Sequence, residues 1–137
     1  MRRLCIILGD QLNLDSIIFN DFDRQQDLLW MAEVHVESTH VWSHKQRIAL
    51  FLSAMRHFAA ELVLQAYPLY YLKLEQHNFQ SLGQALGDCL QIMQPHEVRM
   101  VHSGDYRVWE EITATCQRYG IVFNQLDDNH FLSTPQN

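Results

Sequence analysis

The sequence predicts a single α/β domain, a Rossmann-like five-stranded parallel sheet with helices on both faces. Five short apolar runs recur along the chain, and three segments with helical spacing of apolar residues separate the later runs. Strands that alternate with helices in this way form mainly parallel sheets. Right-handed crossovers then favour the strand order 3-2-1-4-5.

The first two predicted strands follow one another without a helix between them. Residues 2–9, "RRLCIILG", form a short continuous apolar run, as expected for a strand covered on both faces. Residues 27–34, "DLLWMAEV", form the second such run, and an irregular segment separates the two.

The other three strands are each preceded by a predicted helix. They are "YPLYYLKL" at 67–74, "HEVRMVHSG" at 96–104 and "GIVFNQL" at 120–126. Pro68 stands near the start of the first of these, where a missing N–H is tolerated.

The first helix is predicted from about Ser43 to Gln65. Ser43 and Gln46 have the S-x-x-Q spacing of a capping box. The apolar residues that follow recur at helical spacing and indicate a face turned toward a core. They are Ile48, Phe51, Leu52, Met55, Phe58, Ala59 and Leu62.

Two shorter helices are predicted in the second half of the chain. One begins at Ser81, where Ser81 and Gln84 repeat the capping-box spacing. The other runs over about 106–119, with Gly120 as its C-terminal stop.

Length and charge limit the classes of function. A chain of 137 residues, 47% hydrophobic and 19% charged, fits one globular domain. The net charge is −6, and an acidic domain repels a phosphate backbone. We therefore expect duplex DNA to bind this chain only very weakly.

The cysteines and the apolar runs indicate a cytoplasmic protein. Cys5, Cys89 and Cys116 lie far apart within apolar runs, and no C-x-x-C occurs. This pattern is typical of core residues in a reducing compartment rather than of a disulfide or metal framework. No apolar stretch approaches the length of a membrane span or a signal peptide.

The predicted topology places a ligand crevice between the first and fourth strands. In the order 3-2-1-4-5 these two strands are neighbours whose connections leave in opposite directions, and open α/β sheets bind ligands at such a point. The residues at the two strand ends are Gly9-Asp10-Gln11 and His102-Ser103-Gly104-Asp105. The stretch "LGDQL" is therefore expected to form one wall of a small-molecule site.

Common phosphate-binding motifs do not explain this site. A single glycine replaces the G-x-G-x-x-G fingerprint, and there is no P-loop. A phosphoacceptor receiver domain would need clustered acids after the first strand, but Asp10 stands alone there.

The histidines and acids that follow the second strand could bind a metal ion or a polar ligand. His35, His40 and His44, with Glu37 between, could suggest a metal, but surface histidines explain this spacing better and we predict no metal site. Glu33 and Glu37 are either acceptors for a polar heterocycle or solvated loop acids, the commoner fate. The sequence indicates no nucleophile and no other catalytic residue.

Several stretches, taken together and in this order, resemble one family. They are "LGDQL", "MAEV", "HKQRIALFLSAMRHFA", "SGDYRVW" and "DDNHFLS". They are similar to the N-terminal domain of the photolyase-related proteins, the iron–sulfur bacterial cryptochromes and (6-4) photolyases. The resemblance covers Arg3 to about Ser133. The loop after the fourth strand departs from the family's T-E-P-G-E-Y-R pattern, reading His102-Ser103-Gly104-Asp105-Tyr106-Arg107 here.

The resemblance implies a light-harvesting role. In that family the N-terminal α/β domain can hold a ribityl-lumazine antenna chromophore, whereas FAD, a four-iron cluster and the DNA-binding groove belong to a separate helical domain. The resemblance thus implies a domain over 1–133 with a tail at 134–137, non-catalytic in itself. Its partner would be the C-terminal flavin domain of a longer parent protein in light-dependent DNA repair or blue-light sensing, and the isolated domain would be prone to self-association.

The topology and the resemblance together give one set of expected chromophore-binding residues. They are Gly9, Asp10, Gln11, Glu33, Glu37, Lys45, Ile48, Ser103 and Gly104. Two other hypotheses stay open: a stand-alone nucleotide-binding or signalling α/β domain, and a domain with an empty pocket that only packs against a flavin domain.

Overall fold

A computed structural model describes residues 2–9, 11–34, 45–76, 79, 81–102 and 106–126, with backbone only for 45–51. Its central element is a parallel sheet of order β3-β2-β1-β4-β5. The predicted topology is therefore confirmed. The strands are β1 (Arg3–Ile6), β2 (Asp27–Ala32), β3 (Leu69–Leu72), β4 (Glu97–Val101) and β5 (Val122–Leu126).

The helices begin and end close to the predicted positions. They are α2 (Lys45–Leu64), α3 (Leu82–Met93) and α4 (Tyr106–Arg118), with short 3-10 turns η1 (Ile17–Phe19) and η2 (Leu74–Gln76). The Ser81 hydroxyl accepts a hydrogen bond from the Gln84 N–H at 3.2 Å, which confirms that cap. Gly120 follows α4 with a φ of 68°, as a helix stop requires. The predicted cap at Ser43 lies outside the described residues.

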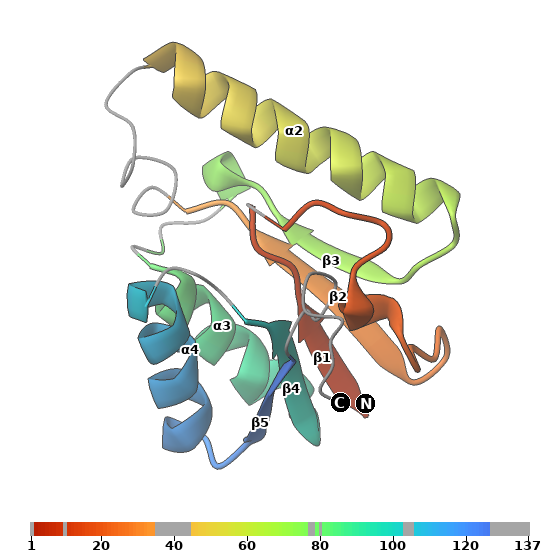
Figure 1. Cartoon of the computed structure of the whole chain (residues 1–137). Helices are drawn as coiled ribbons and strands as arrows, with labels where there is room; N and C mark the ends of the chain where they lie inside the picture. The colour runs from red at the N-terminus through yellow and green to blue at the C-terminus, as the bar shows by residue number, and fades with distance from the viewer. Residues whose placement is uncertain are drawn as a thin grey trace, which may run out of the picture.

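Side chains that alternate along the strands face two different apolar layers. On one face, odd-numbered residues such as Cys5 and Met31 pack with the buried stripe of α2, formed by Met55, Phe58, Ala59 and Leu62. On the other face, even-numbered residues such as Ile6 and Trp30 pack with α3 and α4. Figure 1 shows α2 on one side of the sheet and α3 with α4 on the other. The continuous apolar runs of β1 and β2 follow from this double coverage.

The helices of the described part of the chain are too short or too polar to cross a membrane. Their apolar residues instead form the stripes that face the sheet.

Candidate functional site

The carboxyl ends of β1 and β4 meet at the predicted switch point. The registers pair Ile6 of β1 with Met100 of β4, so both strands end at the same edge of the sheet. Beyond β1 the chain stays buried through Ile7, Leu8 and Gly9. The Gln11 N–H then donates to the Leu8 carbonyl at 2.9 Å, which turns the chain back at this edge.

Gln11 links the two strands across the switch point. Its side-chain Nε2 donates to the carbonyl oxygens of Val101 at 3.0 Å and His102 at 3.3 Å. Its Oε1 lies 3.5 Å from the Leu8 nitrogen, longer than an ordinary N–H···O bond. Gln11 therefore fixes the loop after β1 to the end of β4, and its amide oxygen, which makes only a long contact with Leu8 N, keeps acceptor capacity.

The end of β4 is also bonded to the end of β5. The His102 N–H donates to the Leu126 carbonyl at 2.6 Å, and the His102 Nδ1 contacts the Gln125 amide nitrogen. These contacts join the residue after β4 to the last two residues of β5.

Glu33 directly follows β2 and is completely buried, with an exposed fraction of 0%. Its carboxylate accepts two hydrogen bonds from the Arg56 guanidinium, at 2.7 Å from Nε and 2.8 Å from Nη2. The Leu74 N–H donates to it at 2.9 Å, and the Tyr71 hydroxyl donates to it as well. Of the two alternatives for Glu33, the solvated loop acid is therefore wrong. Odd-numbered side chains of β2 face α2, and Glu33 continues that alternation into the interior.

The hydrogen bonds keep Glu33 ionised in spite of its burial. Burial raises the pKa of the carboxyl, but the hydrogen bonds from Arg56, Tyr71 and the Leu74 backbone outweigh it, and the pKa falls below its ordinary value. The same carboxylate raises the pKa of Arg56, and burial together with Glu33 raises the pKa of Tyr71. Such a group is poorly suited to proton transfer, because every change of its protonation breaks several bonds.

Most of the other expected site residues cannot be placed. Asp10, Glu37, Ser103 and Gly104 lie outside the described residues, as do the three histidines at 35, 40 and 44. Lys45 and Ile48 lie on α2, but their side chains are not described. Within the described part of the chain, no cluster of three metal-ligating side chains occurs.

The three cysteines are core residues, as predicted. All are free thiols and buried. Burial raises the pKa of Cys5 and Cys116 to about 12 and that of Cys89 to about 11. A thiol with so high a pKa carries almost no thiolate at neutral pH and is a poor nucleophile.

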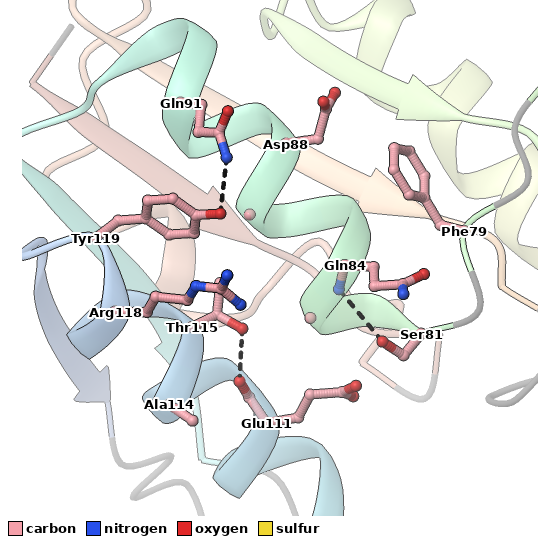
Figure 2. A pocket seen from close by; sticks show the side chains of 12 residues that line it. Phe79, Ser81, Gln84, Asp88, Gln91, Glu111, Ala114, Thr115, Arg118 and Tyr119 are labelled. Atoms are coloured by element: carbon pink, nitrogen blue, oxygen red, sulfur yellow. Dashed lines mark hydrogen bonds between the residues drawn. The ribbon is translucent and has the colours of Figure 1, made fainter.

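A concave region lies between α3 and α4 and has a volume of about 580 Å³. Figure 2 shows hydrogen bonds at several of its polar side chains, among them the one that Gln91 of α3 donates to the Tyr119 hydroxyl at 2.8 Å. Its floor contains Gly83 and Gly87, and a Cβ at Gly83 would lie 2.7 Å from Glu111 Cγ. These glycines permit close packing of the helices, a role that their spacing of four residues could have suggested.

Comparison with known proteins agrees with the resemblance noted in the sequence. A model of the deoxyribodipyrimidine photo-lyase-related protein family matches residues 5–137. The (6-4) photolyase of Agrobacterium fabrum (strain C58) is 32% identical over 135 residues, which are 98% of this chain. The chain spans 27% of the length of that relative. The chain belongs to the deoxyribodipyrimidine photo-lyase-related protein family.

Proposed function

We propose that this domain binds a ribityl-lumazine antenna chromophore and harvests light for a flavin domain of a photolyase or cryptochrome. The observation that carries the proposal is that the carboxyl ends of β1 and β4 meet at the topological switch point, where open α/β sheets bind ligands. A buried glycine, Gly9, and an amide that joins the two strands, Gln11, lie there in a member of the photolyase-related family.

The described residues at this edge of the sheet fit such a ligand. Gly9 brings bare backbone to the end of β1, where a side chain would occupy space needed by a ring. The Gln11 Oε1 has acceptor capacity for a hydroxyl donor such as those of a ribityl chain. Ile7, Leu8 and Val34 are buried in the two apolar cores near the same edge, and so make this edge a firm apolar base for a site. Binding and exclusion of water are all that an absorbing pigment needs from its protein.

The chemistry of repair or signalling then belongs to another domain. The chain covers 27% of the relative's length, which leaves room in such a protein for a domain with FAD and a four-iron cluster. DNA would be contacted through that domain, in keeping with the net charge of −6 here. We expect this chain alone to repair no pyrimidine lesions under light, with or without added FAD.

A titration with ribityl-lumazine, followed by fluorescence quenching and absorption, tests the proposal. Asp10→Ala should weaken binding by about 1–3 kcal/mol if a buried partner on the ligand is left unsatisfied. Asp15→Ala, an exposed acid in the same connection, is the matched control and should bind as the wild type does.

The same titration can contradict the proposal. Failure of the wild type to bind the pigment would remove the antenna role. Binding of a nucleotide by a protein that ignores lumazine would favour the stand-alone nucleotide-binding domain instead.

A further inference from the structure

The buried ion pair at the end of β2 joins three separate segments. Glu33 follows the last residue of β2, Arg56 lies on α2, and Tyr71 and Leu74 belong to β3 and η2. In the part of α2 whose side chains are described, apolar residues also pack on the sheet, and their contacts are not directional. A bidentate arginine–carboxylate pair, by contrast, fixes both distance and orientation.

Arg56 is well placed to orient the amino-terminal half of α2. It lies next to Met55, which is buried against the sheet, and the same helix continues back to Lys45. At about 1.5 Å of rise per residue, Ile48 lies about 12 Å along the helix axis from Arg56. A small rotation of α2 about the Arg56 contact would therefore displace the positions of Ile48 and Lys45 relative to the sheet.

The geometry also argues that Glu33 does not touch the ligand. Its carboxylate has an exposed fraction of 0% and is surrounded by donors from α2, β3 and η2. A ligand that used this carboxylate would have to displace Arg56 or Tyr71 and leave a buried charge short of a partner, which is costly.

We propose that Glu33 and Arg56 are positioning residues that set α2 over the carboxyl edge of the sheet, so that the helix can form the second wall of the chromophore crevice. This inference rests on the proposed function, because it names how that site is shaped. It assigns Glu33 a role through Arg56 rather than through contact with the pigment.

The molecule supplies a matched control at the opposite end of the same strand. Asp27, the first residue of β2, is also buried and also forms a bidentate pair, with Arg2 at 2.9 and 2.7 Å. That pair contacts neither α2 nor the carboxyl edge in the described residues. Its loss should lower stability without changing the crevice.

The experiment compares Glu33→Gln and Arg56→Lys with Asp27→Asn and Arg2→Lys. Each variant is titrated with ribityl-lumazine at a temperature where it is folded, and the induced circular dichroism of the bound pigment is recorded. Hydrogen exchange of 45–64 is measured without ligand. Arg56→Lys keeps the charge but loses the bidentate geometry, so orientation is tested separately from electrostatics.

Glu33→Gln and Arg56→Lys should each weaken lumazine binding about tenfold or more and alter the induced circular dichroism of the bound pigment. Both should also speed hydrogen exchange in α2. The two control variants should bind within about twofold of the wild type, although their stability falls. A Glu33→Gln protein that binds normally, with unchanged α2 exchange, would overturn the inference. Loss of binding with unchanged exchange would also overturn it, because it would make Glu33 a direct ligand.

The outcome for the proposed function can be separated from the outcome for this inference. If the wild type binds no lumazine, the antenna proposal fails. The exchange comparison still decides whether Glu33 and Arg56 hold α2, because it needs no ligand. Faster exchange in the Glu33 and Arg56 variants than in the Asp27 and Arg2 variants supports that role, and equal exchange contradicts it.

Discussion

The two ends of strand β2 each bury one acid in a bidentate pair with an arginine, but they join different parts of the molecule. At the amino end, Asp27 is 4% exposed and pairs with Arg2. At the carboxyl end, Glu33 is 0% exposed and pairs with Arg56. Burial raises the pKa of both carboxyls, but the hydrogen bonds that they accept outweigh this effect, so both pKa values lie below their ordinary values. Electrostatics alone therefore does not distinguish the two pairs.

The segments that each pair connects do distinguish them. Arg2 immediately precedes β1, and β1 pairs with β2 from Asp27 onward, so this pair lies within the sheet and its connecting turn. The Asp23 N–H also donates to Asp27 at 2.9 Å. The Glu33 pair instead connects a strand to a helix of another layer. The comparison teaches that the same interaction fixes strand ends at one edge and a helix position at the other, which is the edge where α/β sheets bind ligands.

Removing Arg56 should produce the largest loss of stability. Arg56→Met leaves Glu33 buried without its cation, and we expect about 3 kcal/mol, the low end of such losses because Arg56 is itself partly exposed. Arg2→Met should cost less, because Arg3, 4.0 Å from the Asp27 carboxylate, still supplies a positive charge there. Urea denaturation measures both.

Two outcomes of this experiment bear on the comparison. Equal losses of stability in Arg56→Met and Arg2→Met would contradict the difference proposed between the two ends of β2. Adding Glu33→Leu to Arg56→Met should recover part of the lost stability, because the uncompensated buried charge is then removed.

Tyr71→Phe should have the next largest effect. It removes a hydroxyl that donates to a charged, buried carboxylate, and such bonds contribute about 1.5–3 kcal/mol. Tyr70→Phe on the same strand is the control: Tyr70 is 38% exposed, and its change should stay within about 0.5 kcal/mol. A Tyr71 effect no larger than that of Tyr70 would show that the hydroxyl adds nothing to the pair.

The pH dependence of stability should reveal both acids. Each has a folded-state pKa below its ordinary value, 4.5 for Glu33 and 3.8 for Asp27, so its contribution is complete above that value and is lost as the pH falls through the lowered pKa. The stability difference between the wild type and Glu33→Gln should therefore shrink in acid. That between the wild type and Asp27→Asn should begin to shrink only below its own, lower ordinary pKa. Urea denaturation between about pH 6 and pH 3 measures this, and a difference independent of pH would contradict it.

Glu75→Gln should have the smallest effect. Glu75 bonds Arg56 at 2.9 Å, but its side chain is 65% exposed, and Arg56 keeps its two bonds to Glu33. Exposed pairs contribute little to stability because water screens them. We expect no measurable change in the melting temperature. A loss of stability as large as that of Tyr71→Phe would show that the exposed Glu75–Arg56 pair supports the buried Glu33–Arg56 pair.

The sequence by itself determined the arrangement of the layers. The apolar runs gave buried strands such as β1, the alternation with helices gave the order β3-β2-β1-β4-β5, and Ser81 and Gly120 marked helix ends where the structure has them. These features depend on residues close together in the chain, whose spacing reports burial directly. The family resemblance also depends on short stretches of the amino-acid sequence, and the family match over residues 5–137 confirms it.

Only the tertiary structure decided which polar residues meet. Glu33 bonds residues 23 and 38 positions away, and Gln11 bonds a carbonyl 90 positions away. Periodicity shows that a position faces the interior but not which side chain comes to it from another element. From the sequence, Glu33 could therefore be a solvated loop acid. In the folded protein, α2 and β3 bring Arg56 and Tyr71 within hydrogen-bonding distance of it. The physical reason is that a buried charge is tolerated only with its partners, and those partners come together only when the layers pack.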